Sequence, residues 1–221
     1  MREIVLDTET TGLSPEQGHR IVEIACYELV DHLPTEHFFQ VYINPERTID
    51  PGAFSVHGIG RQFLYTMPKF GQIADSFLAF IGDDPLVIHN ATFDMKFLNA
   101  ELLRSGREPL MADRAIDTLA MARSMYPGAR ATLDALCRKF DIDNSARTLH
   151  GALLDCELLA EVYLELIGRR EPEIELSADE EGPAWLYGPP RAPRKHPPVS
   201  EEERAAHVEL VEKMDNPIWA A

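Results

Sequence analysis

The sequence is poor in basic residues, in cysteine and in long apolar runs. Its 21 lysines and arginines stand against 37 aspartates and glutamates, which gives a formal net charge of −16. This balance excludes a broad basic surface for gripping nucleic acid, because such surfaces neutralise phosphates with lysine and arginine. It leaves open a nucleic-acid enzyme that takes its positive charge from metal ions and is brought to its substrate by a partner.

The three cysteines, Cys26, Cys137 and Cys156, are widely spaced and form no C-x-x-C pair. This spacing favours small buried side chains in a reducing compartment over a disulfide framework or a zinc site. No apolar run approaches the ~20 residues that a membrane span needs. The N-terminus has no charged-then-apolar signal segment, so the expected localisation is cytoplasmic.

The chain does contain three expected strands followed by alternating helices and strands. β-Branched and apolar residues predict antiparallel strands at 4–9, 21–30 and 38–43, with a turn at 31–34. Residues 44–68 are rich in turn residues. Helical spacing and short apolar runs then predict helices at 70–81, 95–104, 132–140 and 152–168, and strands at 86–88 and 115–118, the second of which runs into a further helix. This order is typical of an α/β domain with a mixed sheet flanked by helices.

The composition changes at residue 169, beyond which eight of the 16 prolines lie. We therefore expect a domain at 1–168, a flexible proline-rich linker at 169–198, and a C-terminal segment at 199–221. Ser200 followed by Glu203 has the spacing of a capping box and predicts a short helix in that segment.

One stretch carries the strongest functional signal, Ile4-Val5-Leu6-Asp7-Thr8-Glu9. Residues i and i+2 of a strand point to the same face, so Asp7 and Glu9 are expected to project together. Two adjacent carboxylates repel each other unless a positive charge lies between them. Mg²⁺ prefers such oxygen ligands. Taken alone, however, the pair is more often the solvated polar end of a strand.

Three further residues favour a metal site. Asp94 follows an apolar strand and begins a helix, and Asp155 lies in the long helix one turn past His150. Strand ends and helix starts of an α/β sheet converge on one crevice, so we expect the four carboxylates to meet there. Two divalent cations held by them would cleave a phosphodiester bond. A histidine side chain ordinarily titrates near neutrality, so His150 suits the role of a general base.

These residues together resemble the DEDDh family of 3′–5′ exonucleases. The three motifs are Asp7-Thr8-Glu9, Asn90-Ala91-Thr92-Phe93-Asp94 and His150-Gly151-Ala152-Leu153-Leu154-Asp155. Segments at 50–59, 133–137, 142–145 and 147–150 are similar to the proofreading subunits of bacterial DNA polymerase III. The resemblance covers residues 1 to about 168 and implies a ribonuclease H-like fold.

The resemblance also implies a role for each site residue. The four carboxylates, Asp7, Glu9, Asp94 and Asp155, would hold two divalent cations, either Mg²⁺ or Mn²⁺. His150 would act as the general base. Contacts to the terminal nucleotide would come from Thr8, Val56 and His57, together with Asp7, Glu9 and Asp155.

The implied function is removal of mispaired 3′-terminal deoxynucleotides within a replicative polymerase. The implied partners are the single-stranded 3′ end of DNA, the polymerase (alpha) subunit bound through the C-terminal segment, and a small theta-like accessory subunit. The family often carries a glutamine-led apolar motif for the sliding clamp, whereas this linker has Glu173-Ile174-Glu175-Leu176. Two alternatives stay open, an RNA-trimming exonuclease of the same family and a catalytically silent scaffold.

Overall fold

The computed structural model describes residues 1–147, 149–168 and 200–213. The chain divides into two units, Met1–Glu173 and Ile174–Ala221, and each is described by itself. The predicted linker at 169–198 and the end of the predicted C-terminal segment, 214–221, lie outside the described residues. Among the described residues, no helix has the length and apolar character that a membrane crossing requires.

The second unit contains α8 (Glu201–Glu212), which begins as the sequence predicted. The Glu203 N–H donates to Ser200 Oγ at 3.2 Å, and the Ser200 N–H donates to Glu203 Oε2 at 2.9 Å. This reciprocal pair is the expected capping box, which satisfies backbone donors that have no partner inside the helix.

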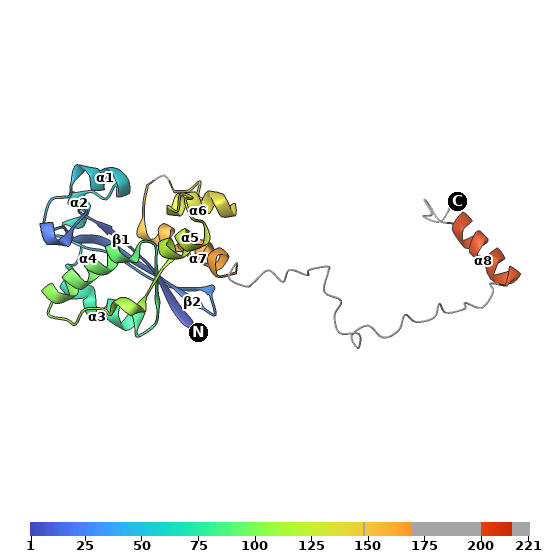
Figure 1. Ribbon diagram of the computed structural model, residues 1–221, viewed down its shortest axis with the longest axis horizontal. Coiled ribbons are helices and arrows are strands. Elements are labelled where there is room, and N and C mark those ends of the chain that lie inside the picture. The colour runs from blue at the N-terminus through green and yellow to red at the C-terminus, as the bar shows by residue number, and fades with distance from the viewer. Residues whose placement is uncertain (148, 169–199, 214–221) are drawn as a thin grey trace. The chain divides into compact units, whose positions relative to one another are not determined.

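A five-stranded mixed sheet forms the centre of the first unit, with the strand order β3-β2-β1-β4-β5 (Figure 1). β1 (Arg2–Thr10), β2 (Ile21–Val30) and β3 (Leu33–Tyr42) are antiparallel neighbours. β4 (Leu86–Ile88) runs parallel to β1, and β5 (Ala115–Asp117) runs parallel to β4. The predicted mixed sheet and its three opening antiparallel strands are confirmed.

The turn between β2 and β3 is shorter than predicted. Asp31 and His32 have φ values of 51° and 66°, as in the two-residue turns that join twisted antiparallel strands. β3 therefore starts at Leu33, and the placement of Pro34 in the turn was wrong. A strand tolerates this proline because β3 lies at the edge of the sheet, where a missing N–H breaks no ladder.

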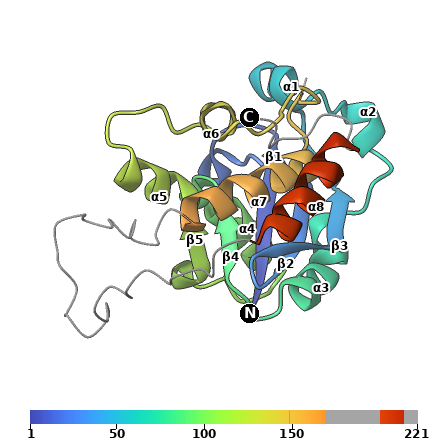
Figure 2. The same ribbon diagram turned by 90° about the vertical axis from the view of Figure 1, so that its right-hand side faces the viewer.

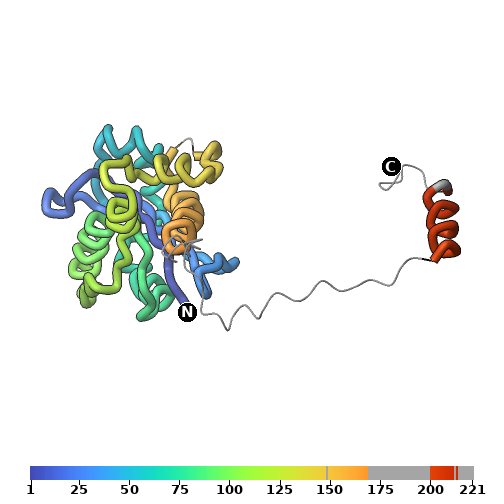
Figure 3. The backbone as a smooth tube through the Cα atoms, turned by 45° about the vertical axis from the view of Figure 1, so that its right-hand side comes forward, coloured from blue at the N-terminus to red at the C-terminus, as the bar shows by residue number. Residues whose placement is uncertain are grey.

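Helices cover both faces of the sheet, as Figure 2 and the tube in Figure 3 show. The helices of one face are α3 (Phe70–Ile81) and α4 (Ala91–Arg104). Those of the other face are α5 (Thr118–Met125), α6 (Leu133–Phe140) and α7 (Ala152–Gly168). The predicted helices are thus present, although α4 begins at Ala91 and not at 95.

Two short helices occupy the segment that the sequence indicated only as turn-rich. They are α1 (Pro51–His57) and α2 (Arg61–Leu64). Pro51 stands at the first helical position and Gly58 ends α1 with a φ of 69°, so the helix has the usual proline start and glycine stop. Two 3-10 turns, Pro15–Gln17 and Ala112–Arg114, complete the connections.

The alternation along β1 decides where its acidic residues point. Ile4 and Leu6 pack into the apolar core under α3 and α4, whereas Val5 packs into the core under α7. Asp7 and Glu9 continue the face of Val5, because side chains alternate with a period of two. The end of β1 therefore presents two carboxylates to α7.

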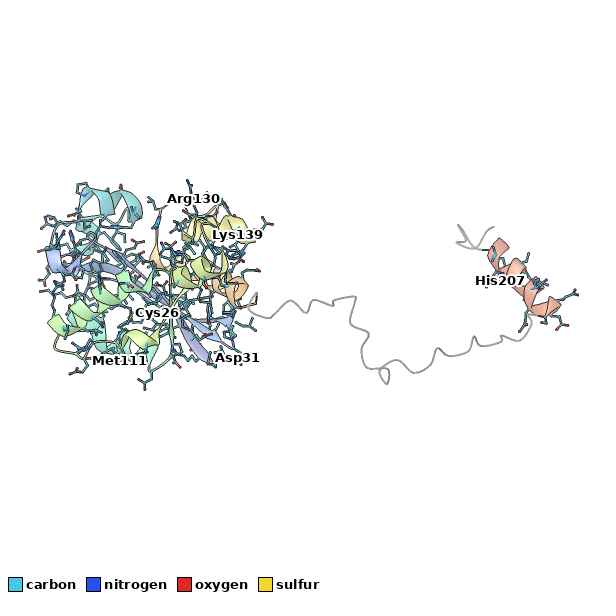
Figure 4. All side chains as sticks on the ribbon, in the orientation of Figure 1. Cys26, Asp31, Met111, Arg130, Lys139 and His207 are labelled. Carbon is cyan, nitrogen blue, oxygen red and sulfur yellow. The ribbon has the colours of Figure 1, made fainter. Side chains whose placement is uncertain are left out.

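All three cysteines are buried and free, as the sequence predicted. Cys26 lies inside the first unit (Figure 4). Burial raises the pKa of the Cys26 thiol, which keeps it protonated and unreactive.

Candidate active site

A cleft of about 540 Å³ is lined by residues of β1, α4 and α7 and by the segment before α7. Its lining includes the four predicted carboxylates, the predicted base and Thr8, namely Asp7, Thr8, Glu9, Asp94, His150 and Asp155. The expected convergence of strand ends and helix starts thus brings together residues that lie far apart in the chain. Val56 and His57 are not part of this lining.

Asp94 is held at the start of α4 by contacts with two strands' ends. Asn90, the residue before α4, has a φ of 67°, and its N–H donates to Asp117 Oδ1 at 3.1 Å. The Thr8 hydroxyl donates to Asp94 Oδ1 at 2.6 Å. This hydrogen bond links β1 to α4, and the proton of the Thr8 hydroxyl is already used.

The cleft gathers negative charge in a poorly solvated place. Burial, together with the charges of Asp155, Glu23 and Asp94, raises the pKa of Glu9 to about 8. Burial likewise raises the pKa of Asp94 to about 7, against the lowering effect of its hydrogen bond from Thr8. The pKa of Asp7 also lies well above its ordinary value, because of burial and its carboxylate neighbours. These carboxylates ionise together more readily when a cation offsets their repulsion.

Arg147 is the positive charge closest to this group. Its Nε and Nη2 donate to Asp155 Oδ1 and Oδ2 at 2.5 and 2.6 Å. Its Nη1 donates to Asp134 Oδ1 at 2.7 Å, and Nη2 also donates to His150 Nδ1 at 2.9 Å. The side chain is only 6% exposed, and the pairing with Asp155 raises its pKa.

His150 lies at the junction of the cleft and α1. Its N–H donates to the Val56 carbonyl at 3.1 Å, which ties the segment before α7 to α1. Leu149 rests on Gly58, where an added Cβ would lie 2.7 Å from Leu149 Cδ1. Burial and the Arg147 charge lower the pKa of His150, against the opposing effect of Asp155. Its imidazole is therefore neutral at physiological pH, as a general base must be.

His57 presents a buried donor that the fold does not use. The Ile59 N–H donates to His57 Nδ1 at 2.9 Å, so the proton of the neutral ring is on Nε2. Burial lowers the pKa of His57, which favours this neutral form. Nε2 has no hydrogen-bond partner within the described part of the chain. A buried donor in this state is available to an acceptor on a bound ligand.

The donor atoms suit a hard divalent cation. One ligand atom each from Glu9, His150 and Asp155 lies within 4.8 Å of the others, close enough to surround one ion. Carboxylate oxygens dominate the cleft, and such oxygens favour Mg²⁺ or Mn²⁺ over softer metals. The residues present therefore fit a site for such ions.

Sequence reasoning missed several residues of the cleft. Arg123, His89 and Asp134 line it, and Arg147 received no role, although it lies in a segment that carried the resemblance. The available signal was a lone arginine three residues before His150 in a strongly acidic chain. Figure 4 labels two further basic residues near α6, Arg130 and Lys139. Lys139 Nζ lies 4.0 Å from the centre of the Tyr126 ring.

Comparison with known proteins finds similar domains in exonucleases. The RNase_T family model, described as "Exonuclease", matches residues 4–163. DNA polymerase III subunit epsilon of Rickettsia felis is 57% identical over 174 residues, which cover 77% of this chain and 76% of that protein. The same subunit of Escherichia coli K12 is 48% identical over 174 residues, covering 76% of this chain and 72% of that protein.

A solved structure has the same fold. Exonuclease X in complex with 5′ overhanging duplex DNA superposes with a TM-score of 0.61 and 27% sequence identity. The match covers 76% of this chain and 92% of that chain. The expected ribonuclease H-like arrangement of sheet and helices is thereby confirmed.

Proposed function

The chain belongs to the RNase_T exonuclease family and to the epsilon subunits of DNA polymerase III, and from this premise we propose its activity. It is a metal-dependent 3′–5′ DNA exonuclease that removes mispaired 3′-terminal deoxynucleotides as the proofreading subunit of the replicative polymerase. The observation that carries the proposal is the cleft in which Asp7, Glu9, Asp94, Asp155 and His150 meet.

The metal ligands are Asp7, Glu9, Asp94 and Asp155, and the cations are two Mg²⁺ or Mn²⁺ ions. Bound cations of this kind supply an activated water and stabilise the leaving 3′ oxygen. The raised pKa values of Glu9 and Asp94 support this assignment, because carboxylates crowded in this way gain most from a cation.

His150 takes the proton from the attacking water. Its lowered pKa keeps the ring neutral, and its half-exposed position at the cleft gives it access to solvent and substrate. The backbone bond to Val56 holds it beside α1, so the residues next to the terminal nucleotide also position the base.

The terminal nucleotide lies against β1 and α1. Asp7, Glu9 and Asp155 would hold the cations that offset the charge of its phosphate. Thr8 would lie beside them, and Val56 would pack on the sugar or base. His57 Nε2 donates a hydrogen bond to the nucleotide, since this buried N–H has no partner among the described residues. A mispaired end frays more easily, so its single strand reaches the cleft at a lower unpairing cost.

The assembly follows the family. The C-terminal segment 199–221, tethered by the linker 169–198, binds the polymerase (alpha) subunit. A theta-like subunit binds the domain at 1–168, and the complex works in the cytoplasm. Pull-down of the polymerase subunit by the full chain, and its loss when residues 169–221 are deleted, tests the tether. Undiminished binding by the shortened chain would contradict it.

Hydrolysis of 3′-labelled single-stranded DNA in Mg²⁺ tests the activity. The wild type releases the labelled nucleotide, Asp7→Ala does not, and Asp75→Ala matches the wild type because its carboxylate lies outside the cleft. Equal rates for the wild type and Asp7→Ala would end the proposal. A matched RNA oligonucleotide separates the RNA-trimming alternative, which requires faster cleavage of RNA than of DNA.

A further inference from the structure

We propose that Arg147 is a positioning residue that competes with a divalent cation for Asp155 and blocks His150 until the cation is bound. The inference rests on the proposed function, because it concerns the same cleft. It assigns to Arg147 a resting position on Asp155 and His150, and a second position in which Asp134 alone holds it.

The first support is the geometry at Asp155. Both of its oxygens accept hydrogen bonds from Arg147, at 2.5 and 2.6 Å, and its side chain is only 5% exposed. A divalent cation bound to the same carboxylate would lie within a few ångströms of the guanidinium charge. Repulsion at that range in a poorly solvated site is large, so the two cannot share Asp155 without cost.

The second support is the contact with His150. A guanidinium nitrogen only donates, so His150 Nδ1 must accept from Arg147 Nη2. The remaining proton of the neutral ring is then on Nε2. Neither ring nitrogen can accept a proton in this arrangement. The same arginine therefore occupies a cation ligand and disables the base.

The third support is a retained partner. Arg147 Nη1 donates to Asp134 Oδ1 at 2.7 Å, and the Asn144 amide donates to the same oxygen at 3.2 Å. The Asp134 side chain is 43% exposed and lies outside the group Glu9, His150 and Asp155 that could hold an ion. Arg147 can leave Asp155 and keep one ion pair, which lowers the cost of the exchange.

Cation binding and thermal stability test the competition without reference to activity. Mn²⁺ is titrated by calorimetry into the full-length wild type and Arg147→Met, which keeps the apolar stem and removes the charge. We expect Arg147→Met to bind Mn²⁺ about tenfold more tightly, as expected for the loss of one charge-assisted interaction on the ligand. We also expect its melting temperature to fall in EDTA and to recover most of the difference when Mn²⁺ is added.

The matched control is Arg20→Met. Arg20 donates to Glu101 Oε1 and Oε2 at 2.5 and 2.7 Å, a pair of the same geometry away from the cleft. Its loss should lower the melting temperature equally with and without Mn²⁺ and leave the Mn²⁺ affinity unchanged. If Arg147 has a purely structural role, Arg147→Met should show the same pattern as Arg20→Met.

A measurement on the wild type keeps the inference testable if Arg147→Met does not fold. The ring nitrogens of His150 are followed by NMR, with signals assigned by their loss in His150→Gln. We expect the Nε2-protonated form in EDTA and a change of ring state on saturation with Mg²⁺.

The outcomes separate this inference from the proposed function. If the wild type binds Mn²⁺ and cleaves DNA, but Arg147→Met binds no more tightly, the competition is contradicted and the proposed function stands. If Mg²⁺ leaves the NMR signals of the His150 ring unchanged, the proposal that Arg147 blocks His150 is contradicted. If the wild type binds no cation, the proposed function fails and this inference fails with it.

Discussion

Glu9 and Glu101 are both buried glutamates, but the charged side chains around them have opposite signs. Glu101 accepts two hydrogen bonds from Arg20, and Arg104 lies 3.6 Å away. Glu9 lies opposite Glu23 in the sheet, and the charges of Asp155 and Asp94 also act on it. The charge of Glu101 is therefore neutralised by neighbouring arginines, whereas Glu9 is crowded by other carboxylates.

The difference separates a carboxylate that the fold neutralises from one to which we assign a role in catalysis. A buried carboxylate with a bidentate arginine is satisfied and needs no further ligand. A buried carboxylate among like charges is costly to the fold, and such costs are retained where a site uses them. The comparison therefore predicts opposite consequences when each glutamate loses its charge.

Glu9→Gln should have the largest effect and should act on hydrolysis. We expect the rate on single-stranded DNA to fall on the order of 10³-fold, the loss typical when one charge-stabilising group is removed from an active site. The variant should be at least as stable as the wild type in EDTA at pH 8, because one repelled carboxylate is gone. Single-turnover hydrolysis and thermal melting measure the two effects, and a rate within tenfold of the wild type would break the comparison.

Glu101→Gln should act on stability and not on hydrolysis. Removing the carboxylate leaves Arg20 partly buried without its counter-charge, which costs about 3 kcal/mol of unfolding free energy. Urea denaturation measures the loss, and hydrolysis at 25 °C should match the wild type. A variant that keeps its stability but loses activity would reverse the roles given to the two glutamates.

The crowded carboxylates should also make the stability of the fold depend on pH. The folded pKa values of Glu9 and Asp94, about 8 and about 7, lie above the ordinary values of 4.5 and 3.8. The lowered pKa values of His57, His89 and His150 act in the opposite direction below their ordinary value of 6.5. Above it the folded state binds more protons at these carboxylates, so its stability in EDTA should fall as the pH rises from about 6.5 to about 8. Thermal melting across this range checks the slope, which saturating Mg²⁺ should reduce. A melting temperature that rises with pH in EDTA would contradict the crowding.

Asp75→Asn should have the smallest effect. Asp75 accepts hydrogen bonds from Arg107 Nε and Nη2 at 2.7 Å each, but its side chain is 82% exposed. An ion pair screened by water contributes less than about 1 kcal/mol, so urea denaturation should show a small loss. A loss as large as that of Glu101→Gln would mean that geometry, and not burial, decides the contribution of such pairs.

The sequence predicted the site residues more completely than it predicted their surroundings. The alternation of a strand places Asp7 and Glu9 together, and this rule is local. The meeting of Asp94 and Asp155 followed from the convergence of strand ends and from the resemblance. The contacts of Arg147 could not be predicted, because they depend on where the segment before α7 lies relative to α6. The start of β3 at Leu33 and the helix α1 were missed because Pro34 and Pro51 were both taken as turn residues. Pro34 is instead tolerated in an edge strand, and Pro51 begins a helix.

A primer-cleavage assay tests whether the cleft is the cation-dependent proofreading site that we propose. A 3′-labelled DNA primer, paired or mispaired at its last nucleotide, is incubated with the full chain in Mg²⁺ or in EDTA. We expect release of the labelled nucleotide only in Mg²⁺, and faster release from the mispaired end. Release that continues in EDTA, or that is equally fast from both primers, would contradict the proposal.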